Sequence, residues 1–237
     1  MAQKVELSIV IPAYNEASRL PRTLEAIERY LDGSTDHVEV IVVDDGSGDE
    51  TGRLIDHVAE TDDRVTPVHL GANRGKGRAL AEGVVRSSGA LVLVTDADLS
   101  APISELPKLE AAITDGADIA IASRAVRGAQ IEVSQPLYRV LMGKAYNLLV
   151  QALLLPGLWD TQCGFKLFRG DVGRRLFADL GHDGFGCDVE VLYRARRQGA
   201  RIVEVPVRWA HSAPTRVSTL RHSVEMLIDL FRIRLGR

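Results

Sequence analysis

Leu91-Val92-Leu93-Val94-Thr95 is followed directly by Asp96-Ala97-Asp98, and this stretch decides the fold class. A short, continuous apolar run is typical of a strand that is covered on both faces. In open α/β sheets, ligands bind outside the carboxyl ends of the strands. Both carboxylates would therefore face a cleft, where hard divalent cations such as Mg2+ or Mn2+ take oxygen ligands and bridge to phosphate. The alternative is an acidic helix N-terminus, a position that Asp and Ser also favour.

Two further strand ends strengthen the first interpretation. The apolar run 40–43 ends in Asp44-Asp45-Gly46-Ser47, and the run 7–11 ends in Pro12-Ala13-Tyr14-Asn15-Glu16. Three strands that deliver polar groups at one edge of a sheet predict a substrate cleft with a metal–diphosphate site.

The composition allows one large domain. The chain has 237 residues, 46% of them hydrophobic, and a formal charge of −3, without a linker or repeat. The first strand begins close to Met1, so we expect no signal peptide, and no apolar stretch approaches the roughly 20 residues of a membrane span. Cys163 and Cys187 make neither a disulfide framework nor a zinc site, which favours a reducing cytoplasm.

Positive charge gathers at the C-terminal end. Residues 194–237 hold ten Arg against three acidic residues, a balance of +7, so the remainder carries −10. This distribution favours an anionic partner such as phosphate, a membrane surface or nucleic acid, and a solvated helix face explains it nearly as well.

The periodicity of the first half predicts alternating strands and helices. This alternation indicates a mostly parallel central sheet with helices on both faces. The expected strands are 5–12, 38–44, 65–70, 90–95 and 118–122. Helices are expected at 16–31 and beginning at about residue 49, followed by one that ends at about residue 87 and one that begins at residue 102. The second half predicts helices at 137–155, 171–180, 187–198 and 218–235, with strands at 160–169 and 201–207.

Three segments outside the strand ends carry polar groups. Asn73-Arg74-Gly75-Lys76-Gly77 is a phosphate-binding loop or a plain turn, and matches neither a Walker A nor a GxGxxG pattern. In the segment 160–166, Cys163 has no nearby histidine to activate it, so a core-facing thiol is favoured. Asp188 and Glu190 lie two apart near a helix start, where an interaction with the helix dipole is expected for one of them.

The motifs resemble glycosyltransferase family 2. The general resemblance rests on the segments 9–16, 42–47 and 96–98, and it implies a GT-A fold, a nucleotide-diphosphate sugar donor and inversion at the anomeric centre. A narrower resemblance, to the dolichyl-phosphate β-glucosyltransferase branch and its mannosyltransferase sisters, rests on 73–77, 123–125, 160–168 and 187–193. The match spans about residues 5 to 235.

The resemblance also implies residue roles. Donor binding would fall to Pro12, Ala13, Tyr14, Glu16, Asp45, Lys76, Asp96, Ala97 and Arg216. Asp98 would ligate the Mg2+ or Mn2+ that carries the diphosphate. Arg124 and Arg139 would grip the acceptor phosphate. Asp160 would either orient one of these arginines or take a proton, and the catalytic set is Asp96, Asp98, Arg124, Arg139 and Asp160.

Three features depart from the family pattern. Ser100 stands where mannosyl relatives often have Gln, and Thr215-Arg216 stands where a Ser-Lys pair is common. We also expect no N-terminal membrane anchor of the kind that the eukaryotic glucosyl enzymes carry. Peripheral membrane contact would then come from the helix 137–155 and the basic C-terminal helix.

The sequence therefore predicts a cytoplasmic, membrane-peripheral glycosyltransferase with a GT-A domain at 1–217 and a basic amphipathic helix at 218–237, part of that domain or membrane-interfacial. It would transfer a hexose, with glucose from UDP-glucose favoured, to a polyprenyl or dolichyl phosphate, without a nucleic-acid partner. One alternative keeps the donor but uses a soluble acceptor, with Asp160 as base. Others are a non-catalytic nucleotide-sugar-binding protein and a nucleotidyltransferase, although the latter's glycine-rich loop after the first strand is missing.

Overall fold

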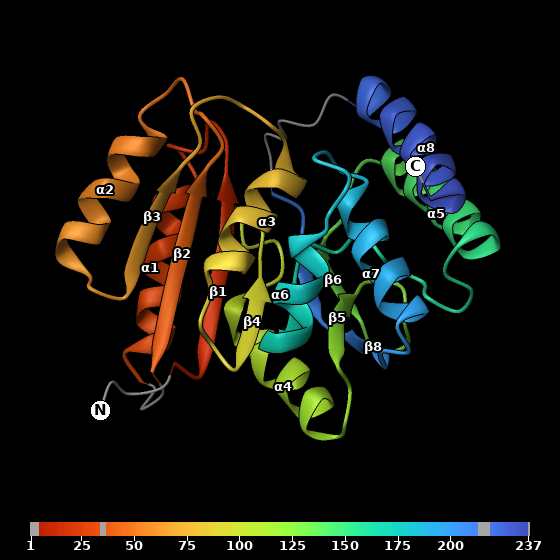
Figure 1. The fold of residues 1–237 in the computed structure, drawn as a ribbon, viewed down its shortest axis with the longest axis horizontal. Helices are drawn as coiled ribbons and strands as arrows, with labels where there is room; N and C mark the ends of the chain where they lie inside the picture. The colour runs from red at the N-terminus through yellow and green to blue at the C-terminus, as the bar shows by residue number, and fades with distance from the viewer. Residues whose placement is uncertain (1–4, 34–36, 213–218, 237) are drawn as a thin grey trace.

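A single twisted sheet organises the part of the chain that the structure describes. The computed structural model describes residues 5–33, 37–212 and 219–236, and within them a seven-stranded sheet has the order β3-β2-β1-β4-β7-β5-β8 (Figure 1). The strands are β1 Leu7–Ala13, β2 Val38–Asp44, β3 Val65–His69, β4 Leu91–Val94, β5 Ile119–Ser123, β7 Lys166–Arg169 and β8 Ile202–Pro206. Among these, β7 alone runs antiparallel to its neighbours, β4 and β5. The predicted mostly parallel sheet is confirmed.

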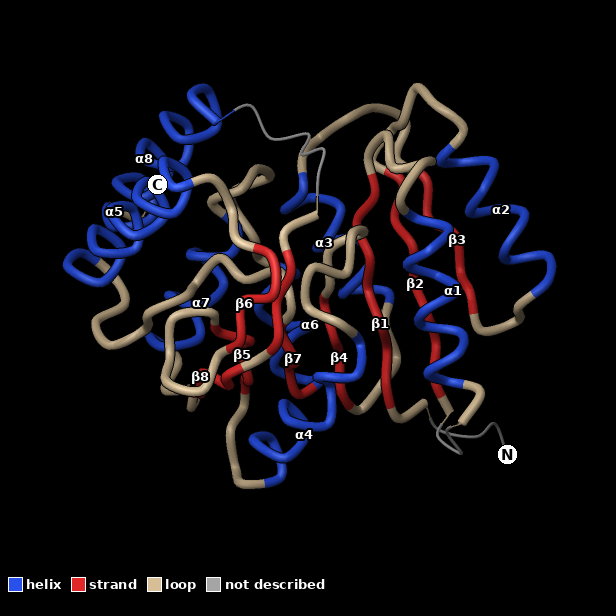
Figure 2. The backbone as a smooth tube through the Cα atoms, turned by 180° about the vertical axis from the view of Figure 1, so that it is seen from behind, coloured by secondary structure: helices blue, strands red, loops and turns tan. Residues whose placement is uncertain are grey.

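Helices cover both faces of the sheet. One face carries α1 Leu20–Leu31, α2 Thr51–Thr61, the 3-10 turn η1 Ile103–Glu105 and α4 Leu106–Thr114. The other face carries α3 Lys76–Arg86, α6 Gly170–Ala178 and α7 Cys187–Arg197 (Figures 1 and 2). Because side chains alternate along a strand, Ile9 and Ile11 join one hydrophobic cluster while Val10 joins the other. Burial on both faces explains why the central strands are continuously apolar.

Two long helices lie side by side near the β8 end of the sheet. α5 spans Leu137–Leu153 and α8 spans Thr219–Leu235, and the two pack against each other (Figures 1 and 2). Their inner faces bury Tyr146 and Val150 of α5 and Leu230 and Ile233 of α8 in the same cluster as α7. In the described residues, no helix is long and apolar enough to cross a membrane.

The predicted strand 160–169 is shorter in the structure, where β7 begins only at Lys166. Residues 160–165 instead form turns and irregular backbone, and side chains take part in fixing them. The backbone N–H of Asp160, for example, donates to Glu204 Oε1 at 2.9 Å.

The sequence did not predict a second, two-stranded sheet. It pairs β6, Gln130–Val133, with β9, Arg208–Ala210, in parallel. All four residues of β6 are exposed, and its alternation of polar and apolar residues, Gln-Ile-Glu-Val, is only four residues long.

Candidate active site

The sheet brings the predicted polar segments to one edge. Because β7 is antiparallel to both β4 and β5, the carboxyl ends of β1, β2, β4 and β5 meet the amino end of β7. Asp45 N–H donates to Ala13 O at 2.8 Å, and Ala122 N–H donates to Phe165 O at 2.9 Å. These backbone bonds continue past the strands and fix the loops at this edge of the sheet.

Asp45 fixes the glycine loop 73–77 beside β2. Its two carboxylate oxygens accept the backbone N–H groups of Arg74 and Gly75, each at 2.8 Å. Burial raises the pKa of Asp45, and these two bonds offset part of that rise. Gly75 has φ +107°, a conformation that favours glycine, and a Cβ there would lie 2.4 Å from Asp183 O. The loop is therefore fixed by its contacts rather than being a free turn.

Lys76 projects from this loop onto the acidic strand end. Its Nζ lies 2.8 Å from Asp96 Oδ1 and 3.6 Å from Asp188 Oδ2. Burial alone would lower the pKa of Lys76, but Asp188 and Asp96 hold it well above its ordinary value. Lys76 is therefore a fixed positive charge beside the acidic strand end.

Asp96 and Asp98 differ in their surroundings. Burial would raise the pKa of Asp96, but Lys76 brings it below the ordinary value. Burial and the charge of Asp96 raise the pKa of Asp98, whose Oδ1 accepts the Ser100 N–H at 3.1 Å. Leu99, between Asp98 and Ser100, has φ +43°. This backbone conformation is uncommon outside glycine and indicates a turn that is held in place by its surroundings.

The two aspartates fit a divalent cation that is shared with a phosphate-bearing ligand. Among the described residues, no group of three or more His, Cys, Asp or Glu could hold a metal ion. Mg2+ and similar hard cations are often bound by one or two carboxylates together with substrate phosphates. The carboxylate oxygens of Asp96 and Asp98 are therefore a suitable donor set.

Arg124 and Asp160 form a tightly bonded pair at the end of β5. Arg124 donates to the Asp160 carboxylate from Nε at 2.7 Å, from a terminal nitrogen at 2.8 Å and from its backbone N–H at 2.8 Å. Two-pronged pairing of this kind fixes the plane of a guanidinium. On the other side, the ring of Trp209 lies 5.1 Å from Arg124 Cζ. The arrangement favours Asp160 as a group that orients Arg124 over one that takes a proton.

The remaining predicted residues have varied surroundings. The carboxylate of Glu16 accepts Arg19 Nε at 2.6 Å, and Arg19 also reaches to 3.7 Å from Asp98. Pro12 is half-buried, Ala13 is buried and Tyr14 is exposed, while the carbonyl of Ala97 accepts the Thr23 hydroxyl at 2.6 Å. Arg139 is half-buried in the first turn of α5, and Arg216 lies outside the described residues.

The comparison with known families is decisive here. The family model for glycosyl transferase family 2 matches residues 8–177. The chain belongs to glycosyltransferase family 2.

Individual family members and solved structures agree with this assignment. The chain is 31% identical to the dolichyl-phosphate beta-glucosyltransferase of Dictyostelium discoideum, over 97% of this chain and 74% of that protein. It is 34% identical to the human protein of the same name, over 97% and 75%. Glucosyl-3-phosphoglycerate synthase from Mycobacterium tuberculosis, in complex with Mn2+, UDP-glucose and phosphoglyceric acid, superposes with a TM-score of 0.73 at 22% identity, over 97% and 80%. The predicted GT-A fold and the narrower resemblance are confirmed.

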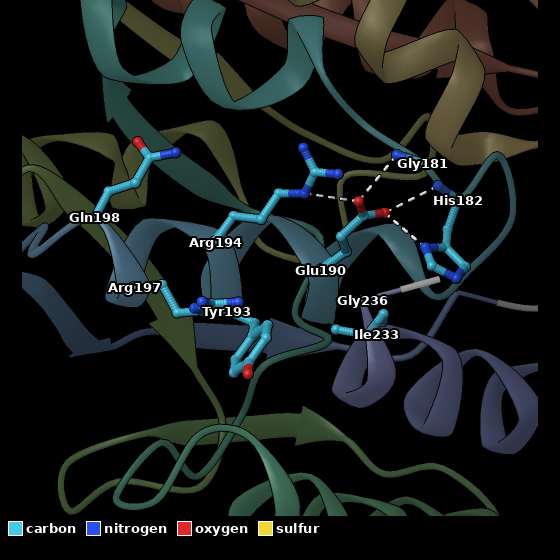
Figure 3. Close-up of a pocket in the computed structure, with 9 residues that line it drawn as sticks. All are labelled: Gly181, His182, Glu190, Tyr193, Arg194, Arg197, Gln198, Ile233 and Gly236. Atoms are coloured by element: carbon cyan, nitrogen blue, oxygen red, sulfur yellow. Dashed lines mark hydrogen bonds and ion pairs between the residues drawn. The ribbon is translucent and has the colours of Figure 1, made fainter.

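Glu190, within the motif segment 187–193, holds the loop at Gly181 and His182, which covers the glycine loop. Glu190 accepts the backbone N–H groups of Gly181 and His182 at 2.9 Å, the His182 ring at 2.8 Å and Arg194 Nε at 2.8 Å (Figure 3). A Cβ at Gly77 would lie 2.4 Å from His182 O, so the two loops are in close contact. A groove of about 500 Å³ lies beside this network, lined by Gly181, His182, Glu190, Tyr193, Arg194, Arg197, Gln198, Ile233 and Gly236.

Sequence reasoning missed several groups that build the site. Asp188, expected only near a helix dipole, contacts Lys76 and the buried Lys166. Glu204 and Trp209, which position Asp160 and Arg124, were not singled out at all. The sequence signal that could have pointed to Asp188 was Lys166, a lysine at the start of β7 between Phe165 and Leu167. Cys163 is buried, and burial raises the pKa of its thiol to about 11, so it suits a core thiol rather than a nucleophile.

Proposed function

We propose that this chain transfers glucose from UDP-glucose to a polyprenyl phosphate such as dolichyl phosphate, with inversion at the anomeric carbon. The relatives at 31% and 34% identity are named for dolichyl-phosphate glucosylation and align with nearly the whole chain. The observation that carries the proposal is the bonded state of Asp160. Both of its carboxylate oxygens accept hydrogen bonds from Arg124. This arrangement suits an acceptor that arrives already ionised and needs no base to remove a proton.

An anionic acceptor needs positioning rather than deprotonation. A phosphate oxygen can attack the sugar carbon directly, provided that it is held in line and its charge is balanced. Arg124, fixed by Asp160 and Trp209, would present its guanidinium to that phosphate, and Arg139 would add a second contact. Arg124 is within electrostatic range of Asp96, which supports acceptor and donor groups in one cleft.

The donor would lie along the ends of β1, β2 and β4. Asp45, Pro12, Ala13, Tyr14 and Glu16 would surround the nucleoside. Lys76 would lie near the base or the phosphates, and Asp96 and Ala97 would contact the nucleotide. Asp98 would hold a divalent cation, Mg2+ or Mn2+, which would neutralise the leaving diphosphate. Arg216 would approach the same diphosphate. The solved structure with Mn2+ and UDP-glucose supports a cation of this kind.

Membrane contact is part of the proposal. The chain would work as a peripheral protein at the cytoplasmic face of a membrane, where a polyprenyl phosphate presents its headgroup. α5 and α8 would provide the contact, because their outer faces keep large apolar side chains exposed beside Lys144, Arg232 and Arg234. We assign residues 1–217 to the catalytic domain and 218–237 to this interfacial helix.

A transfer assay tests the function. Purified protein is incubated with MnCl2 or MgCl2, a panel of labelled nucleotide sugars, and either a short-chain polyprenyl phosphate or phosphoglyceric acid. We expect metal-dependent transfer of glucose from UDP-glucose into an organic-extractable product. Asp98→Asn should reduce it by at least about 100-fold, and Arg124→Lys should lower it because Lys cannot reproduce the two-pronged geometry.

Other results would redirect the proposal. Label in phosphoglyceric acid alone would contradict a lipid acceptor while retaining the donor. Equal activity of the wild type and Asp98→Asn would contradict the metal site. Arg22→Lys, on the exposed surface of α1, is the matched control for Arg124→Lys and should transfer glucose as the wild type does.

A further inference from the structure

A buried lysine stands at the edge of the sheet without a role in the proposed transfer. Lys166 begins β7 and is 2% exposed. Its Nζ donates to Cys163 O at 2.6 Å and to Asp188 Oδ1. Because a buried charge is costly unless it is paired, a hydrophobic residue would serve packing at this position better. The pair therefore calls for an explanation beyond stability.

Asp188 joins this lysine to the active site. It lies in the first turn of α7 and is 8% exposed. While Oδ1 accepts from Lys166, Oδ2 lies 3.6 Å from Lys76 Nζ, and Lys76 Nζ lies 2.8 Å from Asp96 Oδ1. Four groups of alternating charge thus run from the sheet to the acidic strand end.

The Lys76 ammonium makes ion pairs with carboxylates from two different segments of the chain. Lys76 lies at the first position of α3, directly after Gly75. Asp96 in turn is confined by Gly164, where a Cβ would lie 1.9 Å from Asp96 Oδ2. Of the two carboxylates that lie beside the Lys76 ammonium, that of Asp188 is the more deeply buried.

We propose that Asp188, with Lys166 as its buried counter-ion, is a positioning residue for the sugar-nucleotide donor. It holds the Lys76 ammonium against Asp96, so that the donor diphosphate meets a preformed arrangement of charges. This inference rests on the proposed function. Loss of Asp188 should weaken donor binding through Lys76, without removing any group that touches the substrate.

Charge-balanced variants separate positioning from stability. Asp188→Asn alone leaves Lys166 buried and unpaired, and such a change is strongly destabilising. The double variant Asp188→Asn/Lys166→Met removes both charges at similar volume and should fold. We expect it to bind UDP-glucose with MnCl2 roughly tenfold more weakly by calorimetry, the lower end of what outer-shell partners contribute. Its melting temperature should stay close to that of the wild type.

Lys76→Met tests whether the effect passes through Lys76. Once Lys76 is replaced, adding Asp188→Asn/Lys166→Met should lower donor affinity no further, because coupled groups are non-additive. Tyr146→Phe is the matched control: Tyr146 lies close enough to Asp188 to feel its charge, but its hydroxyl makes no hydrogen bond among the described residues. This control should bind the donor as the wild type does.

The possible results are distinguishable. Wild-type affinity in the folded double variant would overturn the proposal, as would effects of the two changes that simply add. If the wild type itself binds no UDP-glucose in the presence of MnCl2, the proposed donor is wrong, and the role of Asp188 in binding it fails as well.

Discussion

Gly164 is the residue at which one methyl group should distort the acidic strand end. A Cβ there would lie 1.9 Å from Asp96 Oδ2, so Gly164→Ala must displace that carboxylate and its contact with Lys76. We expect a fall in transfer of about 100-fold, the effect of misplacing a reacting group by about 1 Å. Overpacking should cost about 1–3 kcal/mol in the free energy of unfolding.

The control for this substitution is Gly33→Ala. Its Cβ would meet only Tyr30 O, at 3.9 Å, well away from the cleft. Steady-state kinetics and thermal unfolding of both variants measure the losses of transfer activity and of stability that are expected for Gly164→Ala alone. Full activity in Gly164→Ala would mean that Asp96 does not need its present position.

At the same scale, the sequence predicted the site only in part. Asp96 and Asp45 could be predicted because each follows an apolar run, and the strand-end rule places such residues at a cleft. Asp188 could not, since its partners Lys76 and Lys166 lie on other elements and only the packing of α7 brings them together. The bonds between Asp160 and Arg124 could not be predicted either, because the two residues lie 36 positions apart in the chain.

Among the elements, the loop 181–186 joins α7 to the glycine loop and should make stability depend on pH. A hydrogen bond to Glu190 raises the pKa of His182 above its ordinary 6.5, and Asp229 raises it further while Arg232 opposes the rise. Burial would raise the pKa of Glu190, but its bonds, His182 first, lower it below 4.5. The charged pair therefore stabilises the fold between these two pKa values.

We expect His182→Asn to expose this dependence, because Asn keeps a neutral donor but no charge. A raised pKa in the folded state means that the contribution of His182 is present below its ordinary pKa, as long as Glu190 stays ionised, and is lost as pH rises through the raised pKa. Near pH 6 the variant should lose about 1 kcal/mol, or about 2–4 °C in Tm, and the difference should vanish once the pH exceeds the raised pKa of His182. A Tm difference that stays constant from pH 5 to 9 would show that the charge of His182 contributes nothing.

The elements that the sequence predicted well are those with a buried face. The strands 38–44 and 118–122 agree with the structure within one residue, because burial imposes the apolar pattern that reveals them. The helix 137–155 agrees within two residues, although many of its apolar side chains are exposed. β6 and the antiparallel direction of β7 were missed for the opposite reason. The alternation in β6 covers only four exposed residues, and the direction of a strand is set by its connections rather than by its composition.

At the scale of the whole molecule, α5 and α8 make an extended apolar surface. The sequence could not tell whether these helices contact each other or a membrane. The structure shows that their inner faces pack together, while Leu141 and Leu148 of α5 and Ile228 and Phe231 of α8 remain exposed. Apolar side chains that gather in this way on a protein surface mark an interaction site. The nearby arginines of α8 favour an anionic lipid surface as its partner.

Replacing Leu148 and Phe231 by Glu should separate membrane binding from catalysis. Both side chains are more than half exposed, at 67% and 56%, so the double variant should fold normally. Burial of each apolar side chain in lipid contributes about 1.5–3 kcal/mol, so we expect at least tenfold weaker binding to vesicles that contain an anionic phospholipid. Activity on a long-chain polyprenyl phosphate in such vesicles should fall in proportion, while activity on a short-chain acceptor in solution should not. Val85→Glu, an exposed apolar position on α3, is the control, and unchanged vesicle binding by the double variant would show that the α5–α8 surface has a different partner.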